Sequence, residues 1–291
     1  MICVLEAGRR YSEHLGDADL ALLGPAVDIA PERAAAVLRN RPDLIEAALA
    51  SVVTFERVFG AEDRALVQAS PFLVFATAIH RSLVELNRTT FVEERVATGV
   101  RVPVFDIAKL REYADAPERR LFTIELLASY TTVASGPIWF RRGGRWRRQR
   151  FSELDPGRMA AALDLVPPAE RPGVYRRLGD LALFLTGVFP EHTARRAVTP
   201  VERERLLRSV GHLAAPSARD VEELTGRADS VLRWLGPRWY ALAANGSPLP
   251  VLARCLRDVA HRYEAARRFL NFVTDRCLFP MRNRLFPSPG D

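Results

Sequence analysis

The chain has 291 residues, of which 48% are hydrophobic and 26% are charged, and its formal net charge at pH 7 is +7. These values are those of an ordinary soluble globular protein that buries one large core or two modest ones. Its longest apolar runs contain carboxylates and end before the roughly 18 uninterrupted apolar residues of a membrane-spanning helix, so we predict no membrane segment.

The N-terminus and the cysteines predict a cytoplasmic protein. Met1–Leu5 is apolar and precedes the first arginines, which reverses the basic-then-apolar order of a secretory signal peptide. The chain has three cysteines, Cys3, Cys255 and Cys277. They are too few and too scattered for a disulfide framework, and no Cys-x-x-Cys pair indicates a zinc or redox site. We therefore expect reduced thiols, no metal site and no cofactor.

Most of the expected helices begin with a proline at the first helical position, where its missing amide hydrogen costs nothing. These prolines are Pro31, Pro42, Pro71, Pro117, Pro156, Pro200 and Pro248. With the apolar periodicity, they predict two or three short helices within 30–60 and helices over 71–96, 117–134, 156–165, 169–189, 200–210, 217–235 and 248–274. Residues 100–106 are expected to be extended, because Pro103 and the valines around it disfavour a helix. The fold class is therefore mainly α, a multi-helix array.

One segment near the middle of the chain has a clear β pattern. Residues 138–142 and 145–151 flank two consecutive glycines, which is typical of a β-hairpin with a two-residue loop. The segment contains six arginines and no acid, and the rest of the chain has 36 of the 42 basic residues against 35 acidic ones. We expect a helical half over 1–136, the hairpin over 137–152 and a second helical half over 153–291. Whether the two halves share one core stays open.

The hairpin is the leading candidate for function. Its expected cross-strand pairs are Trp139 with Arg148, Phe140 with Arg147, Arg141 with Trp146 and Arg142 with Arg145. One face then alternates indole rings, which stack on exposed bases, with guanidinium groups, which bind phosphate as a fork. This predicts a non-enzymatic binding or regulatory protein with an anionic partner, a nucleic acid or an acidic protein. The residues assigned to this site are Trp139, Arg141, Trp146, Arg147 and Arg148. Alternatively, the tryptophans pack on the helices and the arginines pair with the chain's own acids.

A second hypothesis is a small-molecule enzyme or ligand-binding protein with a buried pocket lined by Glu125 and Asp180. Glu125 lies in the otherwise apolar helix 117–134, and Asp180 interrupts the most apolar run of the C-terminal half. A buried carboxylate must be paired or protonated, so two that converge would exchange protons or bind a cation. Alternatively, each of these carboxylates forms an ion pair with a nearby arginine.

His80 is the third catalytic candidate, but its place beside the apolar stripe of helix 71–96 favours a hydrogen-bonded core histidine.

Asp258, His261 and Glu264 recur at three-residue steps, yet the outer two diverge by about 120° around a helix, so they predict no metal site. The chain contains no dinucleotide-binding, phosphate-loop, nucleophile-elbow or zinc-protease motif. Whether the protein is an enzyme therefore stays open.

A third hypothesis is a helical scaffold that forms a homodimer. In the expected helix 248–274, seven apolar residues alternate in steps of four and three, namely Leu252, Leu256, Val259, Tyr263, Ala266, Leu270 and Val273. Such a seam, over 252–273, packs at a shallow angle against neighbouring helices or against a second subunit.

Overall fold

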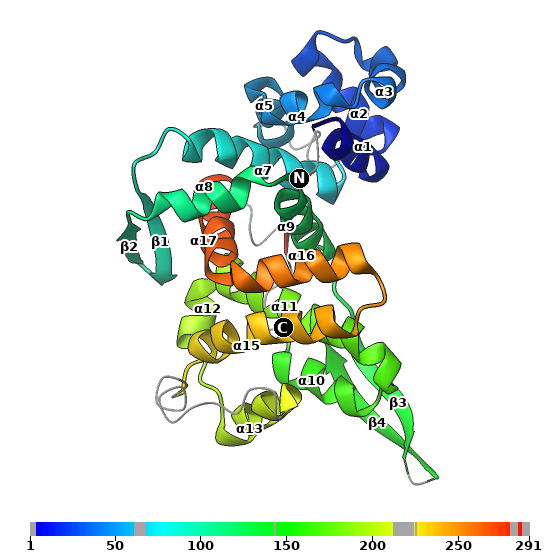
Figure 1. Cartoon of the computed structure of the whole chain (residues 1–291), viewed down its shortest axis with the longest axis vertical. Coiled ribbons are helices and arrows are strands. Elements are labelled where there is room, and N and C mark those ends of the chain that lie inside the picture. The colour runs from blue at the N-terminus through cyan, green and yellow to red at the C-terminus, as the bar shows by residue number, and fades with distance from the viewer. Residues whose placement is uncertain are drawn as a thin grey trace. The chain divides into compact units, whose positions relative to one another are not determined.

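In the computed structural model, the described residues are 4–60, 68–142, 144–211, 224, 226–279 and 285–286. Helices make up most of this part of the chain (Figure 1), so the mainly α fold class is confirmed. No helix within these ranges is both long and apolar enough to cross a membrane.

The chain forms two compact units. Unit 1 comprises Met1–Val92, Pro103–Thr131 and Phe272–Arg282, and unit 2 comprises Glu93–Val102, Thr132–Asn271 and Asn283–Asp291. Each unit thus takes most of one half of the sequence and one short segment from the other half. The arginine-rich hairpin belongs to unit 2.

Unit 1 is built around one long helix, α7 (Pro71–Leu86), which starts at its predicted proline after the cap Ser70. The other helices of this unit are α1 (Val4–His14), α2 (Asp17–Leu23), α3 (Pro31–Asn40), α4 (Asp43–Ala50), α5 (Val52–Phe59), α8 (Ile107–Asp115) and α9 (Pro117–Ser129). A 3-10 turn, Gly24–Val27, follows α2, and a π-helical turn, Thr274–Leu278, also belongs to this unit. Helices α4, α5, α8 and α9 pack on α7, which explains why every residue from Phe72 to His80 is buried.

Unit 2 is centred on the packing of α11 against α15. Its helices are α10 (Pro156–Ala161), α11 (Arg171–Val188), α12 (Pro190–Arg195), α13 (Pro200–Ser209), α15 (Ala228–Gly246), α16 (Pro250–His261) and α17 (Tyr263–Val273), with 3-10 turns at Ala162–Asp164 and Pro168–Glu170. The last two residues of α17 belong to unit 1. All residues of α11 from Leu178 to Val188 are buried. The two helices approach closely because Gly179 has no side chain, and a Cβ there would lie 2.7 Å from the ring of Tyr240.

Four strands form two hairpins within the described residues. They are β1 (Val92–Ala97), β2 (Val100–Val104), β3 (Ser135–Arg142) and β4 (Arg145–Ser152), paired β1 with β2 and β3 with β4. The first hairpin corrects the helix expected over 71–96, which ends at Leu86. The threonines and valines that follow this point favour extended backbone, and Gly99, with a φ of 71°, supplies the turn. The extended backbone expected over 100–106 is confirmed through Val104.

Several other helix bounds differ from the predictions. The helix expected over 117–134 ends at Ser129, because a run of β-branched residues follows it. The helix expected over 217–235 is found as α15, which begins at Ala228 and continues through Pro237. Of the expected range, residues 217–223 and 225 lie outside the described residues.

The helix expected over 248–274 consists of two helices, α16 and α17, because the backbone leaves helical geometry at Arg262, with φ −104° and ψ 24°. No proline or glycine lies at this break, so local propensity does not predict it. Six of the seven residues of the apolar seam are at most 4% exposed, and Leu252 is partly exposed. The chain itself covers the seam, which therefore offers no free face to a second subunit.

Candidate functional site

The hairpin β3–β4 has the register that its sequence predicts. Trp139 lies opposite Arg148, and Arg141 lies opposite Trp146. Gly144 has a φ of 77°, the left-handed conformation that a two-residue hairpin loop requires. The two strands extend away from the helices of unit 2 (Figure 1).

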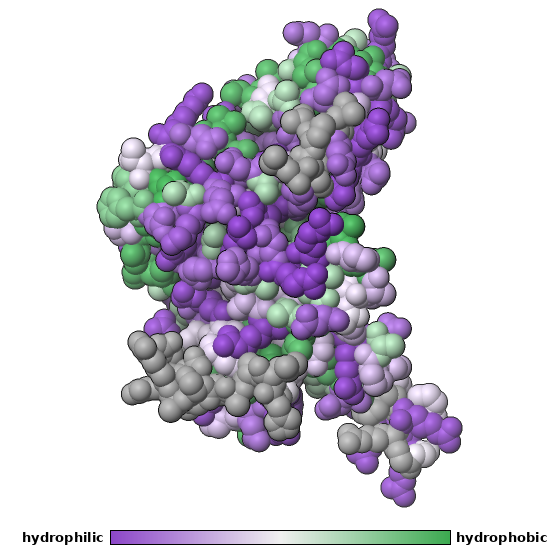
Figure 2. All heavy atoms as spheres, viewed as in Figure 1, coloured by the Kyte–Doolittle hydropathy of each residue, from purple (hydrophilic) through white to green (hydrophobic). Residues whose placement is uncertain are grey.

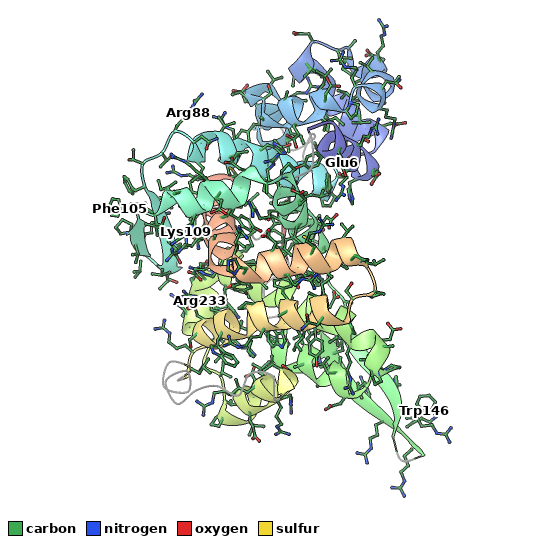
Figure 3. All side chains as sticks on the ribbon, in the orientation of Figure 1. Glu6, Arg88, Phe105, Lys109, Trp146 and Arg233 are labelled. Carbon is green, nitrogen blue, oxygen red and sulfur yellow. The ribbon has the colours of Figure 1, made fainter. Side chains whose placement is uncertain are left out.

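Both tryptophans of the hairpin are exposed. Trp139 is 61% exposed and Trp146 is 70% exposed. The side chain of Trp146 points away from the ribbon (Figure 3). Tryptophan is on average highly buried, so two exposed indoles on neighbouring strands mark a surface suited to contact with another molecule.

The arginines of the hairpin are not neutralised by nearby acids. Arg141, Arg145, Arg147, Arg148 and Arg150 are all exposed, and none forms an ion pair with a described carboxylate. Figure 2 shows hydrophilic side chains over the hairpin, at the lower right of the view. Like charges held this close together favour an anionic partner.

The nearest acid in the sequence, Glu153, is held at the base of the hairpin. Its Oε2 accepts a hydrogen bond from the amide of Ala134 at 2.7 Å, and its Oε1 lies 3.4 Å from Nε of Arg177 in α11. This carboxylate therefore ties the hairpin to α11 and leaves the guanidinium groups farther along the strands unpaired.

One face of the hairpin combines rings and charges. Directly opposed residues of an antiparallel pair share a face, so Trp139, Arg141, Trp146 and Arg148 lie together. Arg150, two residues beyond Arg148, extends the same face toward the base of the hairpin. We call these five residues the Arg/Trp face.

Two arginines depart from the predicted site. Arg150 is not among the residues predicted for the site, although the two-residue period of a strand places it on the Arg/Trp face. Arg147, which was predicted as part of the site, lies on the opposite face with Arg145. Both faces of the hairpin are therefore positively charged, and one of them also carries the indole rings.

Glu125 is an edge residue of unit 1. It lies in α9, its side chain is 36% exposed, and its Oε1 lies 3.4 Å from Nε2 of His14 in α1. This carboxylate is therefore only partly desolvated and has a partner at the surface of its own unit.

Asp180 is buried in unit 2, and its own unit supplies its partners. The hydroxyl of Tyr240 donates a hydrogen bond to Oδ1 at 2.9 Å, and Nε of Arg176 lies 3.8 Å from Oδ2. These contacts provide the pairing that a buried carboxylate requires and link α11 to α15. Asp180 and Glu125 belong to different units, and the partners named here for each lie in its own unit.

His80 is buried in α7 and forms a hydrogen-bonded pair with Tyr11. Its Nε2 lies 3.1 Å from the tyrosine hydroxyl, and the two rings meet nearly edge to face. Burial, with a smaller contribution from the charge of Arg120, lowers the pKa of His80 to about 3. The ring therefore stays neutral at neutral pH, and its pKa lies far below the value near 7 that suits a general base.

Among the described residues, no three histidine, cysteine, aspartate or glutamate side chains are grouped as a metal site requires. Comparison of the chain with models of protein families, with curated proteins and with solved structures found no match. We therefore infer function from the geometry of the hairpin.

Proposed function

We propose that this chain is a non-enzymatic binding or regulatory protein whose hairpin docks on single-stranded nucleic acid. The observation that carries the proposal is the Arg/Trp face. Exposed indole rings alternate there with guanidinium groups that no described carboxylate neutralises.

Each residue type of this face suits one part of a single strand. A guanidinium group binds a phosphate through two parallel hydrogen bonds, and an indole stacks on an unpaired base for about 1–3 kcal/mol per base. Because side chains on one face of a strand repeat every second residue, the Arg/Trp face offers both contacts in alternation. The resulting interface would tolerate many sequences, since every base has a flat face.

The carboxylates of an acidic protein would pair with the arginines but would not stack on the indole rings, whereas a single strand offers both phosphates and flat bases. For this reason the face favours a nucleic acid, and the acidic protein becomes an outcome of the test. A duplex hides its bases inside the stack, so the same reasoning favours a single strand over a double helix.

The proposal is tested by fluorescence anisotropy with the full chain and a labelled single strand of about 12 nucleotides, a length within the range that one such platform binds. Replacing the three arginines of the Arg/Trp face, Arg141, Arg148 and Arg150, together with alanine should weaken binding about tenfold or more. Because each phosphate contact contributes about 0.7 to the slope of log K against log salt, the slope should become shallower by about 2. Replacing Trp139 and Trp146 with alanine should weaken binding without changing that slope.

The matched control removes the same charge elsewhere. Arg33, Arg254 and Arg257 are exposed and have no ion-pair partner among the described residues. Their triple alanine variant should bind within about twofold of the wild type, as expected for charges outside the interface. Equal losses in the two triple variants would show a diffuse charge effect and sink the proposal. Binding to polyglutamate but not to the oligonucleotide would point to an acidic protein partner instead.

A further inference from the structure

Unit 2 contains a cavity of about 200 Å³ at the junction of α10, α11 and α13. Ala160 and Leu163 contribute its apolar lining, and α10 packs on both of the other helices. The cavity therefore lies within one unit, between helices that hold one another in place. Its volume is below the roughly 300–1,000 Å³ of a drug-sized ligand site, so it suits a small metabolite.

Three guanidinium groups line this cavity. Arg171 is the first residue of α11, and Arg205 and Arg208 lie three positions apart on one face of α13. Among the described residues, Arg171 and Arg205 form no ion pair. Arg208 lies 3.0 Å from Glu204, but both side chains are about two-thirds exposed or more, where such pairs are weak.

The Nε of Arg171 is a buried donor with no hydrogen-bond partner in the described part of the chain. A buried donor left unsatisfied is costly, and it is normally paired with protein, water or a ligand. Arg171 also lines the cavity, and an anion placed among the three guanidinium groups would supply an acceptor to this side chain.

Polar groups other than arginine complete the lining. The Ser209 hydroxyl is fixed, since it donates to the carbonyl of Leu206 and accepts from Nε1 of Trp239 at 2.8 Å. Tyr175 supplies an aromatic ring and a hydroxyl, and Asp164 is the one acid among the residues that line the cavity. An aspartate beside three arginines suits a ligand that carries both an anionic group and hydroxyl donors.

We propose that this cavity binds the phosphate group of a small, hydroxyl-bearing phosphomonoester such as a sugar phosphate. A phosphomonoester carries about −1.5 to −2 charges at pH 7 and has three acceptor oxygens, which match several arginine forks better than a single carboxylate does. Asp164 accepts hydrogen bonds from the hydroxyls of the ligand, and Tyr175 and the apolar residues contact its carbon atoms. This site is independent of the hairpin and does not rest on the function proposed for it.

The experiment is isothermal titration calorimetry of the full chain at constant ionic strength with ribose 5-phosphate, inorganic phosphate and ribose as probes. The wild type should bind ribose 5-phosphate more tightly than inorganic phosphate and should not bind ribose. The double variant Arg171→Gln and Arg205→Gln should raise the Kd for ribose 5-phosphate about tenfold or more, since it removes two charge-assisted contacts. Arg205→Gln alone, at an exposed position with no risk to folding, should raise it by a smaller factor.

Two controls isolate the cavity from general charge effects. Arg254→Gln with Arg257→Gln removes the same charge from exposed positions on α16, and the triple hairpin variant removes the other cluster of arginines. Both should leave the Kd within about twofold of the wild type. Failure of the wild type to bind either phosphate, equal affinity for the two phosphates, or equal losses in the cavity and control variants would overturn the proposal.

Discussion

The low pKa of His80 couples the core of unit 1 to pH. The side chain is 3% exposed, and the hydrogen bond to Tyr11 is available to the neutral ring. Burial lowers the pKa of His80 from its ordinary value of 6.5 to about 3, so the folded protein resists protonating a ring that the unfolded chain protonates readily. Between these two values the unfolded state binds more protons, and stability falls as the pH falls.

We expect acid to weaken the folded state through this single residue. Between the two pKa values the unfolded chain binds about one more proton than the folded chain, which changes the free energy of unfolding by about 1.4 kcal/mol per pH unit. Lowering the pH from 6 to 4 should therefore reduce the free energy of unfolding by about 2–3 kcal/mol. Urea unfolding of the wild type and of His80→Asn measures this cost. Because asparagine does not titrate, the free energy of unfolding of the variant should depend less steeply on pH by that amount.

The exposed His261 supplies the control, and His261→Asn should keep the pH dependence of the wild type. If His80→Asn loses stability with acid as steeply as the wild type, the buried neutral ring is not what makes unit 1 sensitive to pH.

At the scale of secondary-structure elements, two glycines of α11 have opposite surroundings. A Cβ on Gly179 would lie 2.7 Å from the ring of Tyr240, whereas a Cβ on Gly173 would have nothing within 4 Å. The first glycine sets how closely α15 approaches α11. The second occupies an open helical position where it contributes only backbone freedom.

The variants Gly179→Ala and Gly173→Ala should therefore change stability in opposite directions. Overpacking against Tyr240 should lower the free energy of unfolding by about 1–3 kcal/mol. At Gly173, the better helix propensity of alanine should raise it by up to about 1 kcal/mol. Chemical denaturation of the two variants checks this, and loss of stability in both would contradict the difference in their surroundings.

Across the whole molecule, arginines fall into paired and unpaired groups. Two buried arginines form ion pairs: Arg267 contacts Glu94 and Glu264, and Arg120 lies 3.0 Å from Glu46. Removing Glu46 would leave the charge of Arg120 buried without a carboxylate partner, so this pair holds its two elements together. The arginines of the hairpin and two of those in the cavity lack such partners among the described residues, and we assign them to ligands because, unlike the scattered unpaired arginines, they are clustered with indole rings or around a cavity.

The burial of the apolar seam leads to a prediction about stability and oligomeric state. Leu256, at 1% exposed, is part of the core, so Leu256→Ala should lower the free energy of unfolding by about 2–5 kcal/mol and leave the molecular mass in solution unchanged. Leu249, at 60% exposed, is the control, and Leu249→Ala should change stability by no more than about 0.5 kcal/mol. Urea unfolding with light scattering measures both quantities. A wild-type dimer that Leu256→Ala converts into monomers would restore the seam as an interface.

Local patterns in the sequence determined the hairpin and five of the seven helix starts marked by proline. The other two are wrong by one or two residues: α4 begins at Asp43 rather than Pro42, and α16 begins at Pro250 rather than Pro248. A proline after a cap sets the first helical residue, and a two-residue loop sets the pairing of Trp139 with Arg148, because both depend on residues close together in the chain. The same patterns did not predict the break at Arg262 or the hairpin β1–β2.

Only the tertiary structure decided which polar groups are satisfied and which are free. Tyr11 and His80 are 69 residues apart, and Asp180 and Tyr240 are 60 apart. The cavity that contains Arg171 likewise joins three helices that are separated along the chain. Such contacts depend on how amphipathic elements pack, and many packings are compatible with one hydrophobic pattern, so the sequence alone names the candidate side chains but not their partners.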